Sequence, residues 1–328
     1  MSVGKEIHLD RPITLHMQGD WGQANLHRIC GWISQEVGKR VPVGSRFAIW
    51  NGRGGTDAMT ALLKREVDLA LFVPAGFAAT AIEGKGLYKR PGMQQLRALA
   101  TLPQDDRLVI AVGEELGVRS LDDIRRKRPE LRVAIAPDDG VNTVGYASHR
   151  LLEAARMPRP DIERWGGSFL EGEAPWDVIP LATDGTVNAV IFEAIMTKYW
   201  RELLASRRMT FIPIEDEVLG ALEGRFGWRR GSVSADRFAG QDEPFETLDF
   251  SDFLLMVRED MAEDLAYLIT CCLCETRDAI ERQYRHFTPQ DSPLSYPLEP
   301  NKMAVTSIPL HDGAARYYRE SNILQPAA

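Results

Sequence analysis

The feature that most constrains the fold is the alternation of short apolar strands with amphipathic helices. Residues 13–18 alternate apolar and polar side chains, a pattern typical of a strand. Apolar residues at helical spacing predict a helix over 22–38, and a second strand follows at 47–50. A further helix begins at 54–57, and a third strand covers 69–73. This β-α-β-α-β order predicts a parallel sheet with right-handed crossovers.

The same alternation begins again in the middle of the chain. Strands are predicted at 108–112, 132–136, 187–192 and 211–214, with a helix at 141–155. An irregular passage at 224–247 leads to a strand at 250–257, a long helix over 260–287 and a Pro-rich segment at 288–309. We therefore expect an α/β protein with two lobes, each a mostly parallel sheet flanked by helices, and a ligand cleft between them. Residues 1–106 begin lobe 1, 107–246 form lobe 2, and 247–328 return to lobe 1.

Charge and hydropathy exclude two classes of partner. The chain has 328 residues and a net charge of −8, and its longest basic run is 125–128, so we expect no nucleic acid as partner. It contains no stretch of 18 apolar residues, so we expect no membrane insertion. The N-terminal residues lack the apolar core of a secretory signal. For the sequence as it stands we expect a cytoplasmic location, or a periplasmic one if a leader has been removed.

The four cysteines do not form a recognisable metal or disulfide pattern. Three of them, Cys271, Cys272 and Cys274, lie within a predicted helix, whereas a redox CxxC normally begins a helix after a strand. We expect these three cysteines to be small buried apolar residues, and three unpaired thiols fit a reducing compartment. We expect neither a metal nor a cofactor.

The predicted topology also places a ligand site. In open sheets with parallel strands, ligands bind beyond the carboxyl ends of the strands. The loops at those ends are 19–25, 51–57, 74–77, 137–143 and 193–196.

The second of these loops has the properties of an anion site. Gly54, Gly55 and Thr56 start a helix, where unpaired N–H groups and a partial positive charge hold a carboxylate. Arg53 would add a charged hydrogen bond. The alternative is that Thr56 only caps the helix and Arg53 is solvated.

Other side chains in or beside the loops are candidates for contacts with the ligand. The polar candidates share a position after a strand or at a helix start and are Gln18, Asp20, Asn25, Asn142, Thr143 and Glu193. The candidates for packing on an apolar ligand body are Trp21, Pro74, Phe77, Trp165 and Phe192. The alternatives are a helix N-cap for Asp20, Asn142 and Thr143, and a core position for the aromatic residues.

Five stretches of the chain resemble one known family. They are Gln18-Gly-Asp-Trp-Gly22, Gly54-Gly-Thr-Asp57 with the following Lys64-Arg-Glu-Val-Asp-Leu-Ala70, Ser120-Leu-Asp-Asp-Ile124 with Val133-Ala-Ile-Ala-Pro137, Asp184-Gly-Thr-Val-Asn-Ala189, and Ile308-Pro-Leu-His-Asp-Gly-Ala314 with Arg316-Tyr-Tyr318. The chain resembles the TAXI family, the solute-binding subunits of TRAP transporters. That resemblance implies the type II periplasmic-binding-protein fold and TRAP membrane subunits as partners. The chain departs from the family at Asp312, where Pro is common, and in its first two loops.

The C-terminal stretch around His311 invites a structural and a catalytic interpretation. Chain ends are poorly ordered unless something holds them. We expect His311 to help dock this segment onto lobe 1, with Tyr317 and Tyr318 supplying apolar area and hydroxyls that find partners. A catalytic His311 would need a companion nucleophile or acid, and the sequence shows none.

Two classes of function fit these observations. The first is a binding protein whose lobes close on a small organic acid. The second is an intracellular decarboxylase or related lyase acting on an aromatic or dicarboxylic acid, with His16, Asp20 and His27 as its acid–base groups. A ligand sensor that acts through a partner is a third possibility. We expect the binding protein.

Overall fold

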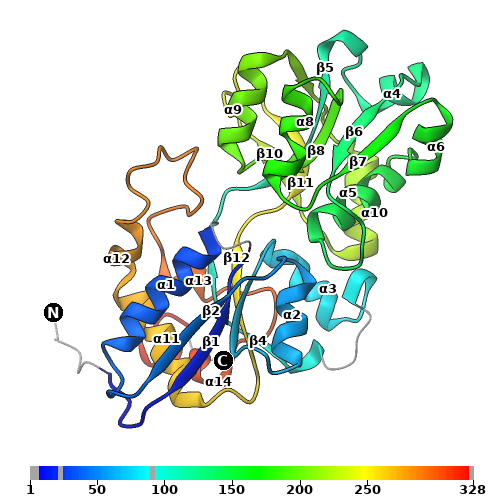
Figure 1. Cartoon of the computed structure of the whole chain (residues 1–328). Coiled ribbons are helices and arrows are strands. Elements are labelled where there is room, and N and C mark those ends of the chain that lie inside the picture. Colours follow the sequence, from blue (N-terminus) through cyan, green and yellow to red (C-terminus); the bar gives the residue numbers. More distant parts are fainter. Residues whose placement is uncertain (1–6, 21–24, 89–92, 325–328) are drawn as a thin grey trace. The chain divides into compact units, whose positions relative to one another are not determined.

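The computed structural model describes residues 7–20, 25–88 and 93–324, and the chain forms two compact units. The first combines residues 1–104 with 252–328, and the second contains 105–251. Each unit is built around one β-sheet with helices packed on it (Figure 1).

The first unit contains a five-stranded sheet in the order β2-β1-β3-β12-β4. Its strands are β1 (Thr14–Gln18), β2 (Arg46–Trp50), β3 (Leu69–Phe72), β4 (Leu96–Leu102) and β12 (Phe253–Arg258). Strands β1, β2 and β3 are parallel, as predicted, whereas β12 is antiparallel to both β3 and β4. The sheet is therefore mixed, with β12 running opposite to the other four strands, which share one direction.

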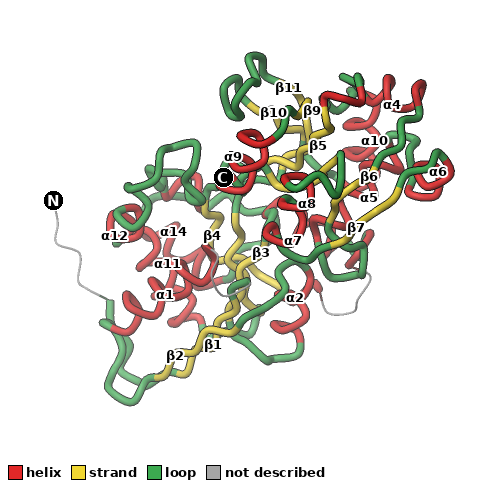
Figure 2. Tube along the Cα trace, turned by 45° about the horizontal axis from the view of Figure 1, so that its top comes forward, coloured by secondary structure: helices red, strands yellow, loops and turns green. Residues whose placement is uncertain are grey.

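Helices cover the two faces of this sheet (Figures 1 and 2). On one face, α1 (Asn25–Gly38), α11 (Glu263–Glu275) and α14 (Asp312–Glu320) share a buried apolar cluster with the strands. On the other, α2 (Thr56–Leu63) packs against β3 and β12. Shorter helices are α3 (Ala78–Ile82), α12 (Arg277–Glu281) and α13 (Pro300–Met303), with 3-10 turns η1 (Ala75–Phe77), η2 (Gly86–Tyr88) and η3 (Met93–Gln95).

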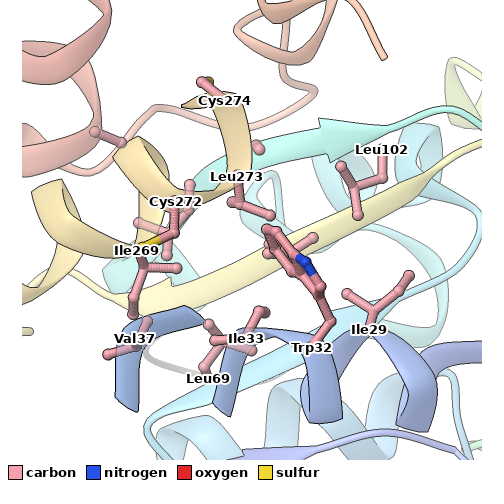
Figure 3. Close-up of a cluster of buried hydrophobic side chains, with 14 of the residues drawn as sticks. Ile29, Trp32, Ile33, Val37, Leu69, Leu102, Ile269, Cys272, Leu273 and Cys274 are labelled. Atoms are coloured by element: carbon pink, nitrogen blue, oxygen red, sulfur yellow. The ribbon is translucent and has the colours of Figure 1, made fainter. Parts of the chain in front are cut away.

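The cysteines lie in this apolar cluster, as predicted for three of them. Trp32 and Ile33 of α1 face Cys272 and Leu273 of α11 in Figure 3, and all four cysteines are buried. Burial raises the pKa of the Cys271 thiol to about 11 and those of Cys272 and Cys274 to about 12. These thiols therefore stay protonated and act as apolar packing groups.

The predicted helix over 260–287 is shorter than expected. α11 ends at Glu275, because Thr276 leaves the helical backbone at φ −110° and ψ 20°. The Thr276 hydroxyl donates a hydrogen bond to the Cys272 carbonyl at 2.7 Å. The chain then resumes as the short helix α12.

The C-terminal segment is held on the first unit. The His311 N–H donates to the Ala98 carbonyl at 2.9 Å, and the His311 Nδ1 caps α14 by accepting from the Gly313 N–H at 3.1 Å. The Tyr318 hydroxyl donates to the Leu99 carbonyl at 3.0 Å, and that of Tyr317 to Glu275 Oε1 at 2.7 Å. The predicted docking role of this segment is confirmed.

The second unit contains a seven-stranded sheet in the order β10-β11-β5-β8-β6-β7, with β9 paired to β5. Its strands are β5 (Arg107–Gly113), β6 (Arg132–Ile135), β7 (Ser168–Glu171), β8 (Ala189–Glu193), β9 (Met209–Phe211), β10 (Arg230–Val233) and β11 (Phe245–Asp249). Strands β6, β7 and β8 are parallel, and β5 is antiparallel to β8, β9 and β11. This sheet is also mixed.

The helices of the second unit are mostly short. They are α4 (Leu121–Lys127), α5 (Thr143–Ala154), α6 (Arg159–Arg164), α7 (Pro175–Val178), α8 (Pro180–Thr183), α9 (Thr197–Ser206) and α10 (Asp216–Phe226), with the 3-10 turn η4 (Glu114–Leu116).

The passage predicted as irregular at 224–247 contains ordered structure. Strands β10 and β11 form an antiparallel pair in it, and β11 continues the sheet by pairing with β5. The second compact unit includes both strands and continues to Ser251. Within the described residues, no helix is long and apolar enough to cross a membrane.

Candidate functional site

The carboxyl ends of β1, β2 and β3 lie at one edge of the first sheet. Gln18, the last residue of β1, is in register with Trp50 of β2 and Ala70 of β3. The loops that follow these strands therefore begin side by side.

Two glycines allow these loops to approach their neighbours closely. A Cβ atom at Gly52 would lie 2.0 Å from Gln18 Nε2, and one at Gly19 would lie 2.3 Å from His27 Nδ1. Both separations are far below van der Waals contact. The absence of a Cβ thus lets Gln18 and His27 lie directly against the neighbouring loops.

The start of α2 offers backbone donors. Gly54 and Gly55 have positive φ angles of 71° and 56°, which favour glycine. In the described part of the chain, their N–H groups have no hydrogen-bond partner. These two amides are available to an anion.

The carboxylate of Asp57, in the first turn of α2, already accepts hydrogen bonds at this helix start. Its Oδ2 accepts hydrogen bonds from Gln18 Nε2 and from the Arg53 N–H, both at 3.0 Å. Thr56 is buried in the first turn. The N–H groups of Gly54 and Gly55 are not among the donors that Asp57 uses.

A small polar cluster lies next to this loop. Asp20 Oδ1 is 3.7 Å from His27 Nδ1, and His27 Nε2 lies 2.9 Å from Asn51 Oδ1. Among the described residues, neither Asp20 Oδ1 nor His27 Nδ1 has a hydrogen-bond partner, although both atoms are buried. The structure thus brings Asp20 and His27 together, and leaves two polar atoms that a ligand could satisfy.

His16 does not join this cluster. It lies in the middle of β1, opposite Ala48 of β2, and its ring is 6.0 Å from that of Trp50. The three acid–base groups expected of an enzyme are therefore not assembled at one place.

The other candidates in the first unit are either bonded within the unit or buried. Asn25 is engaged within the unit, since its Oδ1 accepts from the Tyr284 hydroxyl and its Nδ2 donates to the Pro293 carbonyl. Pro74 follows β3 and starts η1, in which Phe77 is buried at 2% exposure. Trp21 lies outside the described residues.

The second sheet offers an equivalent edge beyond β6 and β8. Asn142 is the N-cap of α5, as its alternative interpretation had it, with its side chain accepting from the Gly145 N–H at 3.0 Å. Thr143 follows it, and its Oγ1 is buried with no partner among the described residues. Glu193 ends β8 and is buried. Thr143 therefore provides a polar atom at a helix start.

Two aromatic candidates are not placed to contact a ligand at this edge. Phe192 is fully buried within β8, so it belongs to the core. Trp165 precedes β7, which is parallel to β6, and therefore lies at the amino edge of the sheet, with its ring stacked 5.8 Å from the Arg128 guanidinium.

The sequence analysis missed a charged group at the start of β5. Arg107 and Arg237 both contact Asp105, and Asp106 beside them is completely buried. Leu108 of β5 is in register with Glu193 of β8, so these residues lie at the same edge. The sequence does not distinguish these arginines from solvated ones, because their burial depends on contacts between distant segments.

Within the described residues, no three His, Cys, Asp or Glu side chains are grouped in a way that could hold a metal ion.

Comparison with known proteins identifies the fold and the family. PhnD1 from Prochlorococcus marinus (MIT 9301), solved in complex with methylphosphonate, is similar over 95% of this chain and 99% of its own, with 12% identity and a TM-score of 0.53. A protein from Bordetella bronchiseptica RB50 is similar over 94% of this chain and 98% of its own, with 13% identity and a TM-score of 0.51. The predicted fold class, two helix-flanked sheets of the type II periplasmic-binding-protein kind, is confirmed. The model of the NMT1-like family matches residues 27–321.

Proposed function

The chain belongs to the NMT1-like family, and within it we propose a solute-binding protein that captures a small organic acid with at least one carboxylate. We propose further that it is a TAXI-type subunit that passes this solute to TRAP membrane subunits. The lobe assignment of 1–106, 107–246 and 247–328 and the seat of the solute between the lobes stay predictions.

The observation that carries the proposal is the pair of free amides at the start of α2. The N–H groups of Gly54 and Gly55 have no partner among the described residues, and they precede an eight-residue helix whose dipole favours an anion. Arg53 lies directly before them in the same loop. A carboxylate would accept from both amides and from the Arg53 guanidinium.

Two further observations support this ligand class. Thr143 Oγ1 in the second unit is a buried hydroxyl without a partner in the described part of the chain, at the first position of α5. PhnD1, which shares the fold, was solved with methylphosphonate, a small anion. A net charge of −8 gives no long-range attraction for an anion, so local donors must supply the affinity.

The test begins with a thermal-shift screen of mono- and dicarboxylic acids. A solute at about 100 times its Kd adds about 2.7 kcal/mol to the free energy of unfolding, which such a screen detects. Calorimetry of the best acid then compares the wild type with Arg53→Ala. One charged hydrogen bond contributes about 1.5 to 3 kcal/mol, so affinity should fall roughly tenfold to a hundredfold.

Arg46→Ala is the matched control. Arg46 is an exposed residue at the amino end of β2, opposite the loop, and the variant makes the same change in charge. It should bind like the wild type. Unchanged affinity in Arg53→Ala would remove Arg53 from the site, and a neutral or cationic solute would refute the proposal.

The Asp20–His27 pair keeps an enzyme as the second candidate. Asp20 Oδ1 and His27 Nδ1 lie 3.7 Å apart. Such a pair could transfer a proton to or from a bound acid. The same acids are therefore incubated with the protein and followed by chromatography. We expect no consumption; consumption that His27→Ala abolishes would favour a decarboxylase or lyase.

A further inference from the structure

A cavity of about 190 Å³ opens in the second unit where β5 begins and β10 ends. It is lined by Asp105, Arg107, Ala194, residues 232–234 and Arg237. Because Ala194 directly follows Glu193, the cavity lies at the edge of the sheet beyond β8. It has room for several water molecules, and hence for a small polar group.

Arg237 is fixed in the wall of this cavity and keeps free donors. Its side chain is only 5% exposed. In the described residues it donates to Asp105 alone, from Nη1 to Oδ2 at 3.1 Å and from Nη2 to the backbone carbonyl at 3.2 Å. A guanidinium has five N–H donors, so most of those of Arg237 remain for a ligand.

Arg107 is held in place by the surrounding backbone. Its Nε donates to the Ser232 carbonyl at 3.1 Å, and its Nη1 contacts the Asp106 carbonyl, Asp249 and the Ser251 hydroxyl. Its Nη2 lies 3.1 Å from Asp105 Oδ1. The Asp105 carboxylate therefore bridges the two guanidinium groups, one oxygen to each.

Asp105, unlike the two arginines, has a largely exposed side chain that can move away from the cavity. Its side chain is 55% exposed, and of the described residues that line the cavity it alone is acidic. The exposed Asp105 carboxylate can be hydrated when a solute carboxylate replaces it on the two guanidinium groups, so that the buried Arg237 charge keeps a partner. The nearby Asp249 is shared between Arg107 at 3.4 Å and Arg229 at 2.9 Å and does not line the cavity.

We propose that this cavity is a carboxylate-binding site of the second unit, in which Asp105 competes with the carboxylate of the solute for Arg107 and Arg237. The inference rests on the proposed function, because it assigns the groups with which the second unit holds the same class of solute. The planar pair of oxygens in a solute carboxylate matches the two guanidinium groups that Asp105 bridges.

The test uses malonate as probe, with sodium chloride at equal ionic strength as reference. Asp105→Asn removes the competing charge, so calorimetry should show malonate binding about tenfold tighter than in the wild type. The control is Asp242→Asn, which makes the same change in net charge at an exposed position of the β10–β11 loop, the loop that also contains Arg237. It should leave the affinity for malonate unchanged. Arg237→Gln should abolish malonate binding, whereas Arg208→Gln, at a side chain 89% exposed, should not.

Far-UV circular dichroism shows whether each variant is folded, and Arg237→Lys provides a second, more conservative variant. If Arg237→Gln unfolds, the lysine variant should fold and bind malonate more weakly, because a single ammonium lacks the planar fork of donors. The Nε–Hε NMR signal of Arg237, in protein with ¹⁵N-labelled arginine, should shift on titration with malonate.

Three results would overturn the inference: equal affinity in Asp105→Asn and the wild type, no malonate binding to Asp105→Asn, or undiminished binding in folded Arg237 variants. These results are separable from failure of the proposed function. If an acid from the screen binds the wild type and all Arg237 variants equally, the solute-binding function stands without this site. If no acid in the screen binds the wild type, yet Asp105→Asn binds malonate through Arg237, the site stands without that function.

Discussion

The buried carboxyl of Asp106 predicts a pH-dependent stability that one substitution should remove. The side chain is fully buried, and Oδ1 accepts from the Arg107 N–H at 2.7 Å and the Ile195 N–H at 2.9 Å. Oδ2 has no partner among the described residues. Burial raises the pKa of Asp106 from 3.8 to about 7, against the opposing effects of these N–H groups and of the Arg237 and Arg107 charges.

The sign of the effect follows from proton binding. Between pH 3.8 and about 7, the folded protein holds a proton on Asp106 that the unfolded chain has lost. The free energy of unfolding therefore falls as the pH rises through this window. Each pKa unit corresponds to about 1.4 kcal/mol, so the fall between pH 5 and pH 8 is roughly 3 kcal/mol for this group.

Asp106→Asn replaces the carboxyl by a neutral group of the same shape and removes this dependence. Urea denaturation of the two proteins at pH 5, 6, 7 and 8 measures it. The difference in free energy of unfolding should shift by roughly 3 kcal/mol in favour of the variant from pH 5 to pH 8. Asp242→Asn, an exposed control, should follow the wild type. Parallel curves for Asp106→Asn and the wild type would refute the argument, whatever their offset.

Two more predictions concern the stability of the fold. His311→Ala should lower the free energy of unfolding by about 0.5 to 2 kcal/mol, because it removes the N-cap of α14, while leaving the affinity for the solute nearly intact; unchanged melting with lost binding would contradict the structural role. Gly145→Ala should destabilise by about 1 to 3 kcal/mol, since its Cβ would lie 2.0 Å from the carbonyl oxygen of Pro137, which follows β6. Gly31→Ala in α1, where nothing lies within 4 Å, is the control and should stabilise by up to about 1 kcal/mol; equal melting temperatures for the two glycine variants would contradict the packing argument.

Strands with alternating or continuous apolar residues could be predicted, such as β1 on the one hand and β3 and β12 on the other. All residues of β3 and of β12 are buried, and such strands appear in the sequence as continuous apolar runs. Strand β10, with the sequence Arg-Gly-Ser-Val, has one buried residue and lies at the edge of its sheet, so its pattern resembles a loop. Strand β4 was missed because its Ala and Leu residues suit a helix equally well.

The loops of the first unit could be located from sequence because they directly follow predicted strands. The pair Gly54 and Gly55 also indicates a tight loop in the sequence, because glycine is favoured at the positive φ angles found there. Trp165 could not be placed, because β7 was not predicted and the edge of the sheet depends on the direction of that strand. The pairing of Arg237 with Asp105 joins residues 132 positions apart, which no local pattern encodes.

Each unit holds an internal carboxylate on hydrogen-bond donors beside the contacts proposed for the solute. Asp57 accepts from Gln18 and from the Arg53 N–H in the first unit, and Asp105 bridges Arg107 and Arg237 in the second. Donors paired in this way cost less to keep buried than unpaired ones. A solute gains affinity only by the difference between its own hydrogen bonds and those that it displaces. If the proposed sites hold the solute, the internal carboxylates should favour acids that engage several donors at once, because a single weak contact does not exceed the interaction already present.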